Sequence, residues 1–302
     1  MNLNLSTPVQ KALNEGRPIL AMESTILSHG LPYPESLNFV LRANELCQES
    51  NVVPATTAII DGVFHIGLDK SQLDFISHDK SIKKVSRQEL GIAAVERWNG
   101  ATTVSATMHI AHAAGICVLS TGGIGGVHRG AEHSFDLSQD LIALKEIPMV
   151  IVSSGAKAIL DLPKTVEVLE TYGVCVIGYK TAFFPAFYSR NSGIKIPHRV
   201  NTYQKIVKLY RKSKELGLNQ AVLVGNPVPL EHEIPIKEIE PIIAGAMKKS
   251  IKAGISGKKT TPFLLDLISR KNGGRGLKTN IALALNNILL GSKIAMNLSE
   301  SA

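Results

Sequence analysis

Six short apolar runs recur along the chain, and each ends in small or polar residues. They are PILAM, TTAIID, ICVLS, MVIVS, VCVIGY and AVLVG. The runs do not alternate with polar residues, which is typical of strands buried on both faces of a largely parallel sheet. Stretches with helical spacing lie between them, as in NFVLRANELCQES, TVEVLETYG and TYQKIVKLYRKSKELG. We therefore expect an α/β fold with helices covering both faces of the sheet.

The composition places the chain among compact globular proteins, because 44% of the 302 residues are hydrophobic and 19% are charged. No Pro-rich or Ser-rich linker divides the chain, so we expect one domain over residues 1–302. The cysteines Cys47, Cys117 and Cys175 are far apart, which favours a reduced compartment. The N-terminus resembles no targeting peptide, and no apolar run approaches the about 20 residues of a membrane helix. We expect a cytoplasmic protein without a membrane segment.

The net charge is +8, and much of the excess lies late in the chain. The basic pairs there are Lys248-Lys249, Lys258-Lys259 and Arg270-Lys271. Aromatic residues make up only 5% of the chain and do not interleave with these pairs, so no stacking platform for nucleic acid is visible. Solvated helix faces, or attraction of a small phosphorylated substrate, explain the charge better. The sequence argues against nucleic acid as the partner.

Lys157 is a candidate nucleophile. The run MVIVS breaks at residues 153–155, and a helical pattern begins around Lys157. A lysine there would lie near the positive end of a helix dipole and in the mouth of a buried sheet, and both effects favour the neutral amine. The alternative is a surface lysine at a helix start, although such positions favour acidic residues.

Glu23 follows the run PILAM directly and is a candidate general acid. It could equally accept backbone N–H groups in a turn. Asp61, Thr121 and Lys157 also stand just past expected strands, and functional residues of parallel sheets gather at that end. The proline-rich loop HGLPYP at residues 29–34 either closes over a site or only turns the chain.

The glycine-rich segment LSTGGIGGVHRGAEHSFDLSQDL, residues 119–141, is suited to an anion, because glycines let backbone N–H groups approach it. A dinucleotide fingerprint fails, since His128 occupies the place of the third glycine, and no P-loop lysine follows. Asp136, Ser138 and Asp140 form an oxygen-rich cluster of the kind that Mg²⁺ and Mn²⁺ prefer. A helix N-cap at Asp136 or Ser138 is a compatible interpretation.

Eight long blocks carry a family resemblance. They are AMESTILSHGLPYPES, VPATTAIIDGVFHIGL, KVSRQELG, GATTVSATMHIAHAAGI, STGGIGGVHRGAEHSFDLSQDL, GAKAILDLPKTVEVLETYGV, GYKTAFFPAFYSRNSG and TPFLLDLISRKNGGRGLKTNIALALNN. In this order, over nearly the whole chain, they resemble the pseudouridine-5'-phosphate glycosidase family, also called the indigoidine synthase A-like family. The resemblance implies a three-layer α/β/α sandwich with a largely parallel or mixed central sheet, assembled as a homotrimer.

The resemblance also implies an activity, the reversible cleavage of pseudouridine 5'-phosphate to uracil and ribose 5-phosphate. The bond broken is C–C, so the leaving-group oxygen used by ordinary glycosidases is absent. In the family a lysine attacks C1' of the opened ribose, the uracil carbon is protonated, and the Schiff base is hydrolysed. Matched residue by residue, Lys157 is the nucleophile and Glu23 the proton donor.

Further positions follow from the same match. The family's divalent cation, usually Mn²⁺ and one per subunit, falls on Asp136. Residues expected to bind the substrate are Lys84, Val104, Ser138, Gln139 and Asp140, with Thr121, His128 and Asn280 lining the same pocket.

Two departures separate the chain from the family's usual motifs. Gln139 stands where alanine is typical, and residues 153–156, SSGA, stand where the family has Cys-Ala-Gly before the lysine. No position matched to a catalytic role is replaced, so an active enzyme is the leading hypothesis. The alternatives are a Schiff-base lyase for another sugar phosphate and a non-catalytic sugar-phosphate-binding homologue.

Overall fold

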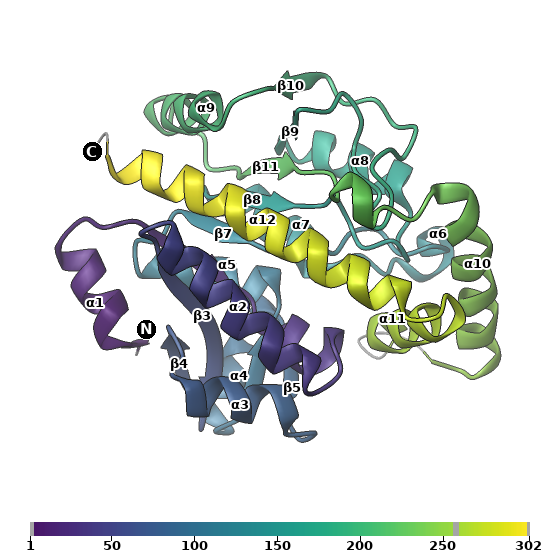
Figure 1. Ribbon diagram of the computed structural model, residues 1–302, viewed down its shortest axis with the longest axis horizontal. Helices are drawn as coiled ribbons and strands as arrows, with labels where there is room; N and C mark the ends of the chain where they lie inside the picture. Colours follow the sequence, from purple (N-terminus) through teal and green to yellow (C-terminus); the bar gives the residue numbers. More distant parts are fainter. Residues whose placement is uncertain (1–2, 256–259, 301–302) are drawn as a thin grey trace.

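The computed structural model describes residues 3–255 and 260–300, and these ranges contain one eleven-stranded sheet with helices packed against it (Figure 1). The main strand order is β1-β4-β3-β2-β7-β8-β11-β9-β10, with β6 paired to β3 and β5 paired to β6. The strands are β1 Leu3–Leu5, β2 Ile19–Met22, β3 Val53–Ile60, β4 Val63–Ile66, β5 Lys83–Val85, β6 Gly100–Thr102, β7 Val118–Ser120, β8 Val150–Ser153, β9 Cys175–Tyr179, β10 His198–Val200 and β11 Val222–Gly225.

The sheet is mixed but mostly parallel. Among the described strands, the antiparallel pairs are those of β3 with β4 and of β3 with β6. The pairs that join β3, β2, β7, β8, β11, β9 and β10 in this order are parallel. All six apolar runs form strands, and β2, β7, β8 and β11 are buried along their whole length. The expected α/β class and the parallel or mixed sheet are confirmed.

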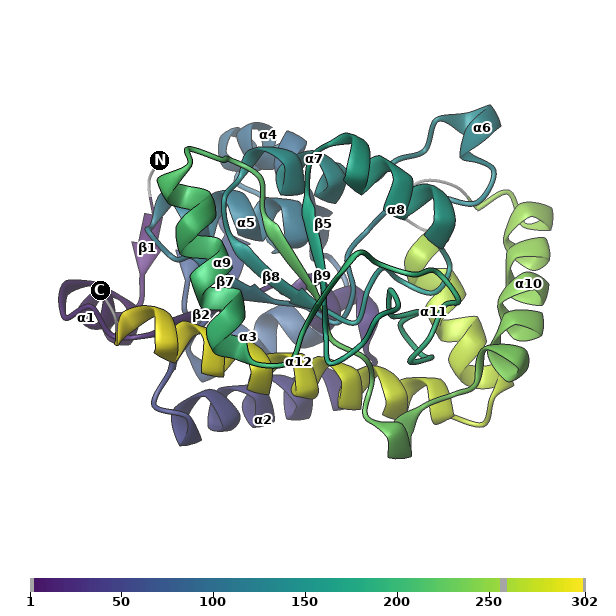
Figure 2. The same ribbon diagram turned by 90° about the horizontal axis from the view of Figure 1, so that it is seen from above.

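Helices cover both faces of the sheet, as Figure 2 shows from above, which gives the expected three layers. Helices α2 and α12 lie on one face and α5, α7 and α8 on the other, while α10 and α11 extend from one end. The helices are α1 Thr7–Asn14, α2 Glu35–Glu49, α3 Lys70–His78, α4 Leu90–Val95, α5 Val104–Ala113, α6 Ala131–Ser134, α7 Gln139–Glu146, α8 Leu162–Thr171, α9 Tyr203–Glu215, α10 Ile236–Lys252, α11 Thr260–Lys271 and α12 Arg275–Ser299. A π-helical turn, η1, spans Ile26–Gly30.

Helix α12 crosses the molecule diagonally in Figure 1, packed along the sheet between α2 and α9. By length and mean hydropathy alone α12 could cross a membrane, although Asn286, Asn287 and Lys293 interrupt its apolar residues. Its buried face includes Leu283, Ile288 and Ile294 and packs on β2, β7 and β8. The apolar character of α12 is therefore explained by its place in the protein core.

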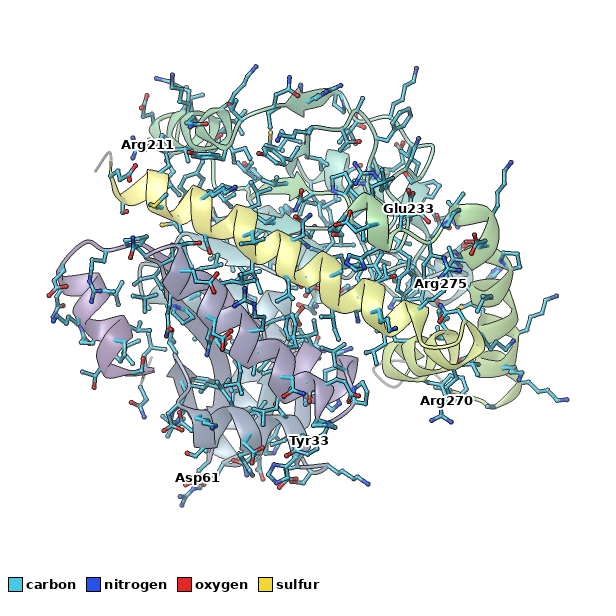
Figure 3. The ribbon with its side chains drawn as sticks, in the orientation of Figure 1. Tyr33, Asp61, Arg211, Glu233, Arg270 and Arg275 are labelled. Atoms are coloured by element: carbon cyan, nitrogen blue, oxygen red, sulfur yellow. The ribbon has the colours of Figure 1, made fainter. Side chains whose placement is uncertain are left out.

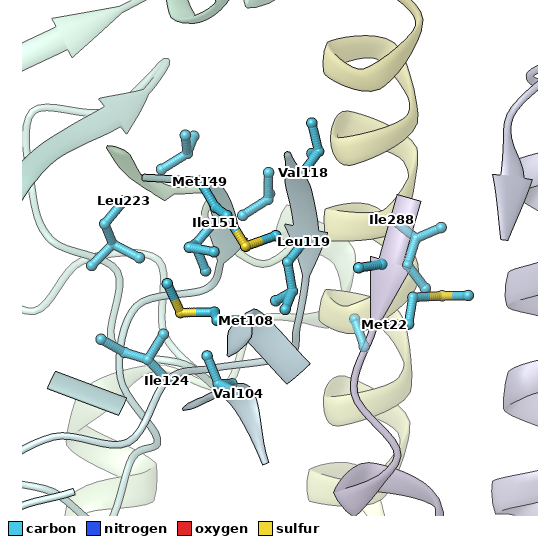
Figure 4. Close-up of a cluster of buried hydrophobic side chains, with 14 of the residues drawn as sticks. Met22, Val104, Met108, Val118, Leu119, Ile124, Met149, Ile151, Leu223 and Ile288 are labelled. Carbon is cyan, nitrogen blue, oxygen red and sulfur yellow. The ribbon is translucent and has the colours of Figure 1, made fainter. Parts of the chain in front are cut away.

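The core lies between the sheet and both helical layers. In Figure 4, Met108 of α5 lies among Leu119 of β7 and Ile151 of β8, and Ile288 of α12 lies beside Met22 of β2; all of these are buried. The buried apolar residues form one connected cluster in the part of the chain that the structure describes. The single domain over residues 1–302 stays a prediction that this cluster supports.

Candidate active site

The carboxyl ends of three adjacent strands bring the candidate catalytic residues to one edge of the sheet. Glu23 follows β2, Thr121 follows β7, and Lys157 lies four residues past β8; β2 pairs with β7 and β7 with β8. Asp61 does not join them. It follows β3 in the turn to β4, its carboxylate pairs with Arg97, and Figure 3 labels it at the periphery.

Two adjoining cavities open at this edge, and the same four side chains line both of them: Glu23, Thr25, Lys84 and Lys157. The smaller cavity, about 40 Å³, is walled mainly by apolar groups and contains Asn280. Its apolar walls come from Ile26, Phe187 and Leu265 with the backbone of Gly122 and Gly123. The larger cavity, about 190 Å³, is polar. The site is therefore divided into an apolar and a polar compartment, with both candidate catalytic residues at their junction.

Two helices begin at the wall of the polar cavity. Thr103 is the N-cap of α5 and Ser138 the N-cap of α7, and both line the cavity together with Gln139 and Asp140. The Ser138 hydroxyl oxygen accepts the Asp140 N–H at 3.2 Å, so the N-cap interpretation of Ser138 is confirmed. Helix N-termini carry partial positive charge and spare N–H groups, which suits this compartment to an anion such as a phosphate.

Asp140 joins the glycine-rich segment to the start of α5. One carboxylate oxygen accepts the Ser105 N–H and the other accepts the Gly125 N–H, both at 2.8 Å. The residue is only 3% exposed, so most of its hydrogen-bonding capacity is directed at the protein. Asp140 thus shapes the cavity wall in addition to lining it.

Glycine is required at two places around this wall. A Cβ on Gly125 would lie 2.1 Å from Ser138 Oγ, which leaves no room for any other residue. Gly155 has φ +78°, and a Cβ there would come within 2.0 Å of the Pro185 carbonyl oxygen. These close approaches let the chain beyond β7 and β8 fold back over the strand ends.

Lys157 does not begin a helix, so that expectation was wrong. Helix α8 begins at Leu162, where Asp161 caps the Lys164 N–H at 3.1 Å and Pro163 occupies the first turn. The Lys157 N–H instead donates to the Ile124 carbonyl oxygen at 3.0 Å. Lys157 therefore lies on a loop joined to the glycine-rich segment, and no helix begins at this residue.

Glu23 is buried, with 6% of its surface exposed, and the Thr121 hydroxyl donates to its carboxylate. The next two residues anchor the segment to β6: the Thr102 N–H donates to Ser24 Oγ at 2.9 Å, and the Thr25 hydroxyl donates to the Thr102 carbonyl oxygen at 2.6 Å. No backbone N–H group of the described residues donates to the Glu23 carboxylate, so the structure does not support the interpretation that Glu23 only satisfies a turn.

Two histidines line the cavities near Lys84. Burial and then the charge of Lys84 lower the pKa of His29, against a weaker opposite effect of the Ile82 backbone. Burial lowers the pKa of His128 as well, with Asp136 opposing and Lys84 and Lys157 adding to the decrease. Both imidazoles are therefore mainly neutral at pH 7.

Asp136 is the candidate metal ligand in the polar cavity. Its side chain is 41% exposed, and its carboxylate lies 3.9 Å from His128 Nδ1. The described residues contain no group of three or more His, Cys, Asp or Glu side chains arranged to hold a metal ion. A single accessible carboxylate fits a hard cation that keeps several waters and binds a substrate phosphate.

Three predicted residues need comment on their placement. The Val104 side chain is fully buried among the core side chains of Figure 4, so only its backbone is available to a ligand. Thr121 lies behind Glu23, outside the walls of the two cavities. Asn280 is 5% exposed and lines the apolar cavity. The cavities are also lined by Lys84, Ser138, Gln139, Asp140, His128 and Asp136, whose roles stay predictions.

The sequence reasoning missed Thr25 and Phe187 as cavity residues and left His29 undecided. Thr25 follows Glu23 directly and could have been found on that ground. Phe187 lies on a loop after β9, with φ +60°, and its ring would be only 2.7 Å from a Cβ on Gly123. No sequence signal marks such an approach of two distant loops.

Comparisons with known proteins identify the family of the chain. The model of the family described as "Indigoidine synthase A like protein" matches residues 8–297. A pseudouridine-5'-phosphate glycosidase from Caldanaerobacter subterraneus subsp. tengcongensis is 47% identical over 99% of this chain and 97% of its own. One from Petrotoga mobilis is 46% identical over 97% and 96%.

Two solved structures share the fold. An indigoidine synthase A-like protein from Thermotoga maritima superposes with a TM-score of 0.90 and 37% identity, covering 98% of this chain and 96% of that one. The prealnumycin C-glycosynthase AlnA, solved in complex with ribulose 5-phosphate, gives a TM-score of 0.91 and 32% identity, covering 99% and 97%. The chain therefore belongs to the indigoidine synthase A-like family.

Proposed function

We propose that this protein is a pseudouridine-5'-phosphate glycosidase that cleaves the C–C bond between uracil and ribose 5-phosphate reversibly. The observation that carries the proposal is the position of Glu23 and Lys157, which come from different strand ends and together line the junction of an apolar and a polar cavity. The relatives from Caldanaerobacter and Petrotoga bear the name of this activity, and AlnA binds a pentose phosphate.

The two compartments match the two halves of this substrate. The flat, uncharged base suits the apolar cavity with Phe187 and Asn280, where an amide side chain can hydrogen-bond a ring carbonyl or N–H. The sugar phosphate suits the polar cavity, where the starts of α5 and α7 and Lys84 supply positive potential. The bond to be broken then lies at the junction, beside Glu23 and Lys157.

The chemistry assigned to the two residues is covalent. As the ribose ring opens, Lys157 Nζ forms a bond to C1' and the ring oxygen takes up a proton. Glu23 donates a proton to the uracil carbon while the C1'–C bond breaks, and the nitrogen lone pair forms the C=N bond of a Schiff base. Water then adds to C1', releasing ribose 5-phosphate and the free amine.

A uracil-release assay tests this function. The protein is expected to release uracil from pseudouridine 5'-phosphate and not from uridine 5'-phosphate, because only the former joins base and sugar through carbon. Release from both nucleotides would indicate an ordinary N-glycosidase, and release from neither would favour a lyase for another sugar phosphate or a non-catalytic binding protein. Pseudouridine without its phosphate is the control for the polar compartment.

We further propose that Asp136 holds one divalent cation, with Mn²⁺ as the expected metal. A cation held there would offset the negative charge of the substrate phosphate. Chelation is expected to abolish uracil release, and Mn²⁺ to restore it. In the Asp136→Asn variant, the Mn²⁺ concentration that gives half-maximal activity is expected to rise by about tenfold or more. Full activity in excess chelator would contradict a metal requirement.

We also propose that the active assembly is a cytoplasmic homotrimer, as the family resemblance implies. Small-molecule substrates and products are its expected partners.

A further inference from the structure

A buried asparagine on α12 contacts the ends of three strands beneath the candidate site. Asn287 is 0% exposed, and its amide nitrogen donates to the Thr121 carbonyl oxygen at 2.8 Å and to Ser154 Oγ at 3.2 Å. Asn226 Nδ2 donates to Asn287 Oδ1 at 2.9 Å. Because Thr121, Ser154 and Asn226 follow β7, β8 and β11, one side chain joins the three segments that leave these strands.

The hydrogen bonds around Asn287 form a closed ring. The Ser154 hydroxyl, which accepts from Asn287, donates in turn to the Asn226 carbonyl oxygen at 2.9 Å. The side-chain amide of Asn226 completes the ring by donating to Asn287. The backbone N–H of Asn226 donates to the Ser153 carbonyl oxygen at 2.8 Å. A buried network in which each member is paired holds its groups rigidly, since any displacement leaves a polar atom unsatisfied.

The ring is connected to the proton donor through one residue. Thr121 receives the Asn287 hydrogen bond at its carbonyl oxygen, donates its N–H to the Val152 carbonyl oxygen at 3.0 Å, and donates its hydroxyl to the Glu23 carboxylate. The backbone of Thr121 is therefore fixed on both sides. From this fixed backbone its hydroxyl orients Glu23 through the hydrogen bond to the carboxylate.

We propose that Asn287 is a positioning residue for the proton transfer: through Thr121 it holds the Glu23 carboxyl against the base, without touching the substrate itself. This inference rests on the proposed function and adds a residue to it. Lys157 has a different anchor, the Ile124 carbonyl oxygen, so the covalent step depends less on Asn287.

The test compares Asn287→Ala with Asn286→Ala. The neighbouring Asn286 is the matched control, because its amide donates to the Pro227 carbonyl oxygen at 3.2 Å and forms no hydrogen bond with Thr121 or Ser154. Asn287→Ala is expected to lower kcat for pseudouridine 5'-phosphate by about 10- to 100-fold with KM changed by less than about threefold. Borohydride trapping of ribose 5-phosphate on Lys157 is expected to keep its rate within about threefold.

A second comparison separates positioning from stability. When Asn287→Ala is added to Glu23→Gln, kcat is expected to fall by less than about threefold relative to Glu23→Gln alone. The reason is that the carboxyl group positioned by Asn287 has already been replaced by an amide, which cannot donate the proton. Additive losses in the double variant would overturn the proposal. Asn287→Asp, which keeps the oxygen that accepts from Asn226, replaces the alanine variant if that one does not fold.

Three further outcomes would also overturn the proposal. The first is that neither Asn287→Ala nor Asn287→Asp folds. The second is that the Asn287 variant loses trapping and turnover to the same extent. The third is that its kcat equals that of Asn286→Ala. An inactive wild-type protein would instead refute the proposed function, which the uracil-release assay detects separately.

Discussion

Replacing Lys157 by arginine is expected to abolish uracil release, with kcat reduced by at least about 10⁴-fold. Arginine keeps the positive charge but cannot form a Schiff base, because its guanidinium does not lose its proton in proteins. Lys157 lines both cavities, so arginine also retains any electrostatic attraction of the phosphate. Turnover with pseudouridine 5'-phosphate and borohydride trapping with ribose 5-phosphate measure the effect.

The matched control is Lys164→Arg, on the first turn of α8. Lys164 is half-exposed and pairs with Glu132 and Asp161, outside both cavities. This variant is expected to keep wild-type turnover and to be trapped on Lys157. If Lys157→Arg retained more than about a tenth of wild-type kcat, or if the wild-type adduct formed on another lysine, the covalent role of Lys157 would be refuted.

The sheet could be predicted well because its strands carry a strong signal. Central parallel strands are buried on both faces, and their sequences are therefore continuously apolar, as in β8 and β11. The three-residue strands β5 and β6 contain KKV and GAT, which are too short and mixed to show a pattern. The antiparallel pairing of β6 with β3 could not be predicted from them.

The start of α8 illustrates how a helix boundary was misplaced. The apolar spacing after Gly155 suggested a helix from Lys157, but Asp161-Leu162-Pro163 is a stronger start signal, with a capping carboxylate followed by proline. The loop at residues 154–161 is held instead by backbone hydrogen bonds to the glycine-rich segment, such as Asp161 N–H to the Val127 carbonyl oxygen at 2.9 Å. Contacts between segments so far apart in sequence leave no local pattern.

The candidate site was predictable to the extent that strand ends meet at one edge. Glu23 and Lys157 could be selected from that rule and their residue types, and the family match added Asp136 and Lys84. The role of Asn287 could not be found in this way. It is one of two adjacent asparagines in the apolar stretch ALALNNILL, and only packing decides that it, and not Asn286, contacts three strand ends.

Replacing Glu23 by glutamine is expected to separate the two halves of the reaction. Glutamine has nearly the same shape and can still accept from the Thr121 hydroxyl, but it has no proton to give to the uracil carbon. We expect kcat for uracil release to fall by about 10²- to 10⁴-fold. Trapping of ribose 5-phosphate on Lys157 should remain within about threefold of wild type, because that step forms the C1'–N bond without protonating a base.

The control is Glu45→Gln, which replaces an exposed glutamate that pairs with Arg42 on α2. This variant should leave both measurements unchanged. Loss of trapping together with turnover would show that Glu23 acts on the sugar or on Lys157, and normal turnover would place the proton donor elsewhere.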